Sequence, residues 1–167
     1  MGTPSHRKAA PVSVACFVVT VSDTRTETSD TSGRAIAELL ESAGHTVVGR
    51  AIVHDEPVLV RALVEQQLAD PAVQVVITTG GTGLSSRDTT YEALAGVMEK
   101  RLDGFGEIFR ALSFQEIGPA AMLSRACAGV ALGKIVVALP GSEHAVRLAV
   151  GKLLLPELGH LVQQVSK

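Results

Sequence analysis

The sequence alternates strand-like apolar runs with segments of helical spacing, and this order limits the fold more than any other feature. Strands are predicted from Val12 to Ser22, from His45 to Val53 and, as the run VQVVITT, from Val73. Apolar runs without polar alternation are typical of parallel strands that helices cover on both faces. The order strand, helix, strand therefore predicts an α/β fold, a three-layer αβα sandwich with a mainly parallel sheet.

Helical signals follow these predicted strands. Four helices are predicted, beginning at Thr31, Pro57, about Thr89 and Ser142. Gly44 ends the first of them, and Pro156 is expected to interrupt the last after Leu155. Between the third and the last, the segment AGVALGKIVVALPG predicts two strands joined at Gly133.

Length and composition favour one domain with a single core. The chain has 167 residues, of which 46% are hydrophobic. Its net charge of -2 gives no general attraction to nucleic acid, and with only 3% aromatic residues it offers few stacking platforms for bases. Cys16 and Cys127 stand alone in apolar runs, which argues against a zinc site or a disulfide scaffold and fits a reducing cytoplasm.

The amino-terminal segment HRKAAPVSVACFVVTVS has the basic start and apolar run of a secretory signal peptide. However, it lacks a convincing cleavage site with small residues, is rich in β-branched Val and is too short to span a bilayer. We therefore expect a flexible tail over residues 1–11, a single domain over residues 12–167, a cytoplasmic location and no membrane partner.

Polar loops follow four of the predicted strands, over residues 22–30, 54–56, 80–88 and 140–142. In open α/β sheets ligands bind beyond the carboxyl ends of the strands, where helices begin. We therefore expect these loops to share one edge of the sheet and to form the binding site.

The loop TTGGTGLSSRDTTYEAL contains the sharpest of these signals. Gly80, Gly81 and Gly83 can adopt positive φ and bring backbone N–H groups close to an anion, and a predicted helix start follows them. Neither the P-loop nor the dinucleotide fingerprint is present. The pattern leaves two interpretations open, a phosphate-binding loop and a plain strand-to-helix turn.

Two acids follow different strands beside this loop. Asp88 precedes TTYE, in which Thr89 and Glu92 fit a capping box, and Asp55 precedes the helix at Pro57, so each acid has a structural explanation. Together they are also suited to hold a hydrated Mg²⁺ that bridges phosphate oxygens. Arg87 remains open between a transition-state cation and a solvated side chain.

Five motifs in order, TVSDT, DTSG, TTGGTG followed by RDTTYEA, MLSR and LPGS, resemble the MoaB/MogA family of molybdenum cofactor biosynthesis, the molybdopterin adenylyltransferases. The resemblance runs from about Val14 to Leu161, and GFGEIFRALSFQEIG is similar to the MoaB branch. It implies a helix-flanked sheet, a homotrimer or hexamer, and the substrates molybdopterin and ATP. It also implies a Mg²⁺-dependent transfer of AMP from ATP to the terminal phosphate of molybdopterin.

The resemblance also implies site residues. Asp55 and Asp88 match the acids that are catalytic and hold the metal, although His54 stands where the family usually has proline. The residues that match the phosphate cradle are Gly80, Gly81, Thr82 and Gly83. The other substrate-binding positions, matched to the pterin side or expected to face the same cleft, are Ser22, Asp23, Ser124, Arg125, Pro140, Gly141 and Ser142. The alternative is a non-catalytic carrier or scaffold for molybdopterin, against which the retained acids argue.

Three of the four phenylalanines, Phe105, Phe109 and Phe114, lie within ten residues. Phe105 and Phe109 are spaced to share one helix face, which suits either core packing or a subunit interface. The family resemblance favours the interface, because relatives form trimers.

Overall fold

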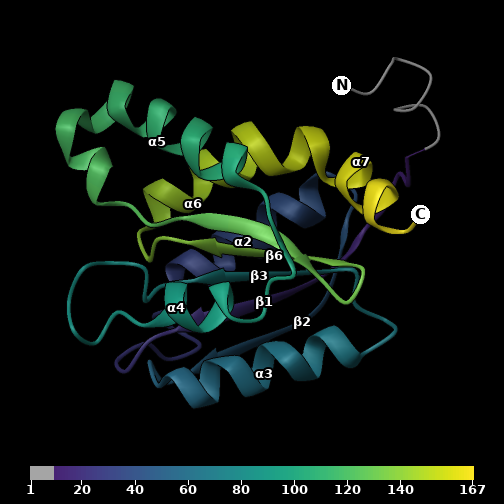
Figure 1. The fold of residues 1–167 in the computed structure, drawn as a ribbon, viewed down its shortest axis with the longest axis horizontal. Helices are drawn as coiled ribbons and strands as arrows, with labels where there is room; N and C mark the ends of the chain where they lie inside the picture. Colours follow the sequence, from purple (N-terminus) through teal and green to yellow (C-terminus); the bar gives the residue numbers. More distant parts are fainter. Residues whose placement is uncertain (1–9) are drawn as a thin grey trace.

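In the computed structural model, which describes residues 10–167, a six-stranded sheet lies between two layers of helices (Figure 1). The prediction of a flexible tail falls almost entirely on residues 1–9, outside the described residues. The strands are β1 (Ala15–Val21), β2 (Thr46–Val53), β3 (Val75–Thr79), β4 (Lys100–Arg101), β5 (Cys127–Ala131) and β6 (Lys134–Leu139). The helices are α2 (Thr31–Ser42), α3 (Pro57–Ala69), α4 (Thr90–Ala95), α5 (Asp103–Ile117), η1 (Gly118–Leu123), α6 (Glu143–Ala149), η2 (Val150–Leu154) and α7 (Leu155–Val165).

The sheet has the order β2-β1-β3-β6-β5-β4. The first four strands run parallel, and β5 and β4 are antiparallel to their neighbours, so the prediction of a mainly parallel sheet is confirmed. The predicted turn between β5 and β6 is also confirmed: Leu132 and Gly133 both have positive φ, 51° and 69°, as tight hairpin turns require.

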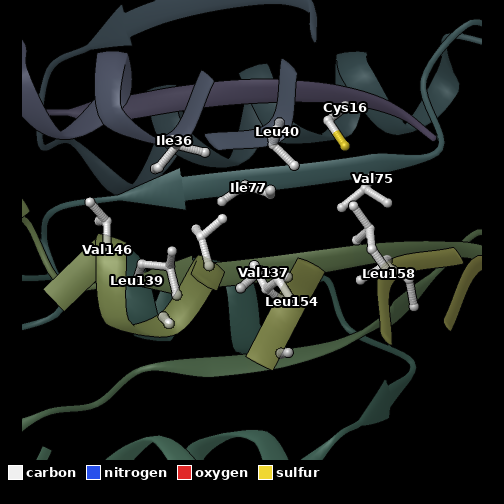
Figure 2. Close-up of a cluster of buried hydrophobic side chains, with 14 of the residues drawn as sticks. Cys16, Ile36, Leu40, Val75, Ile77, Val137, Leu139, Val146, Leu154 and Leu158 are labelled. Atoms are coloured by element: carbon white, nitrogen blue, oxygen red, sulfur yellow. The ribbon is translucent and has the colours of Figure 1, made fainter. Parts of the chain in front are cut away.

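Side chains of alternate strand residues enter two separate cores. In β1, Cys16 and Val18 point to the layer of α2, α5, α6 and α7, whereas Val19 and Val21 point to α3 and α4. Figure 2 shows the larger core, in which side chains from the sheet and from the surrounding helices interdigitate, among them Ile36, Leu40, Ile77, Val137, Leu139, Val146, Leu154 and Leu158. Because both faces of the central strands are buried, their sequences are apolar without alternation.

The expected interruption at Pro156 is wrong. A π-helical segment, η2, connects α6 directly to α7, and Pro156 lies in the first turn of α7. A proline lacks the N–H that an α-helix needs in its interior, and the wider π turn before Pro156 lets the helix continue. None of the helices within residues 10–167 combines the length and apolarity that a membrane crossing requires.

The phenylalanine cluster divides between core and surface. Phe105 and Phe109 are 7% and 1% exposed, and their stacked rings lie 6.5 Å apart inside the larger core. Phe114 is 58% exposed. Other large apolar side chains of α5 and η1 are also exposed, namely Ile108, Ile117, Met122 and Leu123. The aromatic pair is therefore core, and Phe114 is the member of the cluster that is free for a subunit contact.

Candidate functional site

The four polar loops predicted from the sequence meet at one edge of the sheet, where all the parallel strands end. At this edge, two of the loops are hydrogen-bonded to the ends of neighbouring strands. The Ser22 N–H donates to the Val53 carbonyl at 2.9 Å, and the Gly80 N–H donates to the Leu139 carbonyl at 3.0 Å. β2 lies on one side of β1 and β3 on the other, so the strand order reverses direction at β1. Open α/β sheets bind ligands at the carboxyl edge beside such a reversal.

A cleft of about 220 Å³ lies at this edge, between the ends of β1 and β3 and the start of α2. It is lined by Thr20, Val21, Ser22, Arg25, Asp30, Ser32, Thr79, Gly80 and Gly141. The predicted residues Ser22, Gly80 and Gly141 therefore lie together. Ser32 donates a hydrogen bond of 2.5 Å to the Gly141 carbonyl and closes one wall of the cleft.

Asp30 is a structural acid of this cleft that the sequence reasoning did not single out. It is 2% exposed and accepts hydrogen bonds from the Gly33 N–H at 2.9 Å, from Thr20 Oγ1 at 2.8 Å and from Arg50 at 3.1 Å. Asp30 thus caps α2 and holds β1 and β2 to its start. The motif DTSG, an acid before a helical segment, carries the signal that predicts such a cap.

The glycine loop after β3 leaves no room for side chains at its first two positions. Gly80 and Gly81 have φ of 98° and 68°. A Cβ on Gly80 would lie 2.2 Å from the Val21 carbonyl oxygen, and one on Gly81 would lie 2.0 Å from Thr90 Oγ1. Gly83 does not have the positive φ that the sequence predicted, but a Cβ there would lie 2.7 Å from Asp88 Oδ2. Each glycine therefore lets a polar group pack directly against the loop backbone, in the place that a Cβ would otherwise fill.

Asp88 closes the glycine loop on itself rather than capping a helix. Its Oδ2 accepts a hydrogen bond of 3.0 Å from the Ser85 N–H. The predicted capping box is wrong: Thr89 makes no cap hydrogen bond, and Glu92 forms an ion pair with Arg125. The helix α4 that follows has only six residues, so the contribution of its dipole to anion binding is smaller than the sequence suggested.

Asp55 lies against the same loop from the end of β2. Its Oδ1 accepts a hydrogen bond of 3.3 Å from Thr89 Oγ1 and lies 3.2 Å from the point where a Cβ of Gly81 would be. Partial burial raises the pKa of Asp55, and the nearby charges of Asp88 and Asp23 raise it further, against the hydrogen bonds from Thr89. The two predicted acids, Asp55 and Asp88, are therefore brought together, as the resemblance implied.

Asp23 connects three loops. It accepts a hydrogen bond from the Asp55 N–H at 3.1 Å, and His54 Nδ1 lies 3.4 Å from its carboxylate. The Arg87 guanidinium, which donates to Asp23 Oδ2, lowers the pKa of this exposed carboxyl. Arg87 is thus neither free nor simply solvated, because its charge is paired across the mouth of the site.

Arg125 supports the glycine loop from behind. Its guanidinium donates to the carbonyls of Thr82 at 3.3 Å, Gly83 at 2.6 Å and Asp88 at 2.9 Å. It also lies 5.1 Å from the ring centroid of Tyr91. With these partners Arg125 fixes the shape of the loop, and the substrate contact that the resemblance implied for it stays a prediction.

Ser124 lies away from the small cleft. It lines a separate cavity of about 450 Å³ together with Tyr91, Arg101, Arg110 and Arg125. Pro140 and Ser142 remain at the carboxyl edge, but in structural roles: the Pro140 carbonyl accepts from Thr79 Oγ1 at 2.7 Å, and Ser142 caps α6. The structure therefore does not gather all the predicted substrate residues in one place: Ser22, Gly80 and Gly141 line the small cleft, Ser124 and Arg125 line the larger cavity, and the others line neither.

The buried Thr90 hydroxyl was missed by the sequence reasoning. Thr90 is fully buried at the start of α4, and its N–H donates to the Gly81 carbonyl at 3.0 Å. Its Oγ1 has no hydrogen-bond partner among residues 10–167. A threonine directly after the predicted helix start reads as an ordinary helical residue, so the sequence alone gives no sign of an unpaired hydroxyl.

Asp55 and Asp88 are the candidate metal ligands at this edge. In the part of the chain that the structure describes, no three His, Cys, Asp or Glu side chains are arranged to hold a metal ion. Mg²⁺ does not need such a cluster, because it keeps several waters and is commonly bound by one or two carboxylates with substrate phosphates. Asp55 and Asp88, which lie against Gly81 and Gly83, match that donor set.

Comparisons with known proteins point to one family. The family model described as "Probable molybdopterin binding domain" matches residues 17–160. The chain is 47% identical to molybdenum cofactor biosynthesis protein B of Halalkalibacterium halodurans and 45% identical to that of Bacillus subtilis, in each case over 168 residues, 100% of this chain and 99% of the relative.

Solved structures agree with this similarity. A crystal structure of molybdenum cofactor biosynthesis protein B superimposes with a TM-score of 0.91 at 47% identity, covering 94% of this chain and 98% of that one. The tungsten cofactor synthesizing protein MoaB of Pyrococcus furiosus superimposes with a TM-score of 0.82 at 36% identity, covering 95% and 100% of the two chains.

Proposed function

This chain belongs to the MoaB/MogA family of molybdenum cofactor biosynthesis proteins, and from that premise we propose that it adenylylates molybdopterin with Mg-ATP. The observation that carries the proposal is the pairing of Asp55 and Asp88 at the glycine loop. The two carboxylates come from the loops that follow β2 and β3, and they lie against Gly81 and Gly83 of the same turn, close enough for the charge of Asp88 to raise the pKa of Asp55.

In the proposed reaction, an oxygen of the terminal phosphate of molybdopterin attacks the α-phosphorus of ATP. A new bond forms between this oxygen and the α-phosphorus, the bond to the bridging β-oxygen breaks, and pyrophosphate leaves. Because the attacking group is already a phosphate anion, the protein needs no strong base and contributes mainly alignment and charge neutralisation. The absence of a Ser-His or Cys-His pair from the described site fits this chemistry.

Each part of the site has a task in this scheme. Asp55 and Asp88 would hold Mg²⁺, which when bound neutralises charge on the leaving pyrophosphate. Backbone N–H groups of residues 81–83 bind phosphate oxygens, whereas the Gly80 N–H is already used by the Leu139 carbonyl. Arg125 donates hydrogen bonds to three carbonyls of the loop and so holds these oxygens away from the bound anion. Ser22 and Gly141, which line the 220 Å³ cleft, are suited to the molybdopterin side.

We also propose that the protein is a homo-oligomer, a trimer or a hexamer. The support is the set of exposed apolar side chains on α5 and η1, of which Phe114 and Met122 are 58% and 73% exposed. Figure 1 shows the end of α5 and the following η1 at the outer side of the helical layer. Large apolar side chains gathered in neighbouring elements are typical of the buried centre of subunit interfaces.

Pyrophosphate release tests the proposed reaction. Purified protein is incubated with ATP and Mg²⁺, with and without molybdopterin, and pyrophosphate is measured. We expect release that requires molybdopterin and that falls to background in the Asp88→Asn variant. If molybdopterin binds but no pyrophosphate is released by the parent protein, the chain is the non-catalytic carrier of the alternative.

A further inference from the structure

Three arginines line the cavity of about 450 Å³ that lies beside the glycine loop. They are Arg101 from β4, Arg110 from α5 and Arg125, which precedes β5. Cys127 lines the same cavity and shows that the three charges act on one place. Burial raises the pKa of its thiol, and the charges of Arg101, Arg125 and Arg110 lower it in part. The cavity is therefore a positively charged hollow.

Two of the three arginines already have anionic partners. Arg101 Nε lies 3.4 Å from Asp103 Oδ1, and Arg125 pairs with Glu92 besides donating to three carbonyls of the glycine loop. Both guanidinium groups also lie over the Tyr91 ring, at 5.2 and 5.1 Å from its centroid. These contacts hold Arg101 and Arg125 in place and use much of their hydrogen-bonding capacity.

Arg110 is the arginine of this cavity without an anionic partner. It is half-buried, and no carboxylate within residues 10–167 forms an ion pair with it. Its Nη1 donates to the Ser124 carbonyl over a long 3.5 Å. A guanidinium has five N–H donors, so most of those of Arg110 are left for another acceptor. A half-buried charge without a partner is unfavourable, which favours a ligand that brings the negative charge.

Gly106 allows the Arg110 guanidinium to pack against α5 at the wall of the cavity. A Cβ on Gly106 would lie 3.0 and 3.1 Å from Arg110 Nη1 and Nη2, and 2.9 Å from the Ala126 carbonyl oxygen. Glycine destabilises a helix relative to alanine, so its place in α5 is explained by this close approach. The position of the guanidinium is thus built into the helix.

We propose that this cavity binds the phosphate group of a small phosphorylated molecule, with the Arg110 guanidinium as its main partner. The planar fork of a guanidinium matches two phosphate oxygens at once. A volume of about 450 Å³ lies in the range of small-molecule pockets, and Leu102 and Met122 give it an apolar part beside the charges. The inference goes beyond the proposed function, because neither Asp55 nor Asp88 lines this cavity.

Glu107 supplies a test with the opposite sign. It lines the same cavity, three residues before Arg110 on α5, and its carboxylate repels an anion that enters. Removing this charge should therefore strengthen phosphate binding. A gain of affinity cannot come from a variant that is merely misfolded, so Glu107→Gln complements the loss expected when Arg110 is replaced.

The experiment titrates inorganic phosphate, without Mg²⁺, into the parent protein and its variants, followed by calorimetry and by amide NMR signals. In the parent we expect the signals of Gly106 and Ala126 to shift. Arg110→Met should weaken phosphate binding by about tenfold, and Glu107→Gln should strengthen it by about two- to fivefold. The control Arg61→Met should bind as the parent does, because Arg61 pairs with Glu65 on α3 and lies outside the cavity lining.

The source of the phosphate group is identified by titrating AMP and molybdopterin into the parent and Arg110→Met. A loss of affinity for one of them names that compound as the ligand, and unchanged affinity for both assigns the cavity to a third phosphorylated molecule.

Three results would overturn the proposal: NMR shifts confined to residues 81–83, equal phosphate affinity in the parent and Arg110→Met, or weaker binding by Glu107→Gln. Because the phosphate titration contains neither Mg²⁺ nor ATP, its result does not depend on adenylyl transfer. Transfer by a protein whose cavity binds no phosphate would refute this inference alone, and phosphate binding at Arg110 would stand if no transfer occurred.

Discussion

Gly81→Ala should reduce both the stability of the protein and its affinity for phosphate. The new Cβ would lie 2.0 Å from Thr90 Oγ1 and 3.0 Å from Thr90 Cβ, and Thr90 is buried and cannot turn away into solvent. The same Cβ would also lie 3.2 Å from Asp55 Oδ1, so relieving the clash must shift the loop whose N–H groups we expect to bind phosphate. One substitution therefore tests the backbone conformation and the binding loop together.

The magnitude follows from two separate costs. A residue with a Cβ loses about 1–2 kcal/mol in the left-handed region that Gly81 occupies, at φ of 68°. Forcing a methyl group into a filled site costs a further ~1–3 kcal/mol. For a chain of this length each 1 kcal/mol lowers the melting temperature by about 2–4 °C, so the expected decrease is on the order of 4–20 °C.

Gly133→Ala is the matched control, because Gly133 has a φ of 69° and its new Cβ would find its nearest neighbour at 3.7 Å. This variant should carry the conformational cost alone, so its melting temperature should be roughly 2–8 °C lower and its ligand binding unchanged. Thermal unfolding and calorimetric binding of Mg-pyrophosphate are measured on both variants. If Gly81→Ala melts no lower than Gly133→Ala and binds Mg-pyrophosphate like the parent, the glycine loop is only a turn.

Two further predictions address the charges at the site mouth and the assembly. Arg87→Ala should raise the pKa of Asp23 toward the ordinary value of about 3.9, measured by carboxyl-carbon NMR titration. Because the pair lowers the pKa of Asp23 in the folded protein, its stabilising effect is fully present above the ordinary pKa and is lost as the pH falls through the lowered one. An Asp23 pKa that does not change in Arg87→Ala contradicts the pairing. Phe114→Asp should lower the mass measured by light scattering toward the 17.4 kDa of one chain while the helical signal persists, whereas Phe109→Asp should unfold the chain; a parent protein already at 17.4 kDa contradicts the assembly.

The sheet and the location of the site were predictable because they depend on local patterns. Strands buried on both faces must be mainly apolar, as the first three residues of Val75–Thr79 are, and the carboxyl ends of parallel strands share an edge whatever the loops contain. Asp55 and Asp88 could therefore be placed together from their positions after two strands. The turn at Gly133 was equally local, since a tight hairpin requires positive φ.

The side-chain partners were not predictable, because residues far along the chain compete for the same groups. The local capping box failed when Thr89 bonded to Asp55, 34 positions away, and Glu92 paired with Arg125, 33 positions away. The division of the phenylalanines had a similar cause. Helical spacing places Phe105 and Phe109 on one face, but only the packed structure shows that this face meets the sheet.

The most direct test of the account is the mass of the pterin product. The parent protein and Asp88→Asn are each incubated with molybdopterin, ATP and Mg²⁺, the product is followed by mass spectrometry, and molybdopterin affinity is measured on both. The account predicts adenylylated molybdopterin from the parent, none from Asp88→Asn, and similar molybdopterin affinity for the two, because Asp88 does not line the cleft of Ser22 and Gly141 that is suited to molybdopterin. Adenylylated product from Asp88→Asn at nearly the parent rate would contradict the role of this acid and leave Asp88 as a loop-closing residue.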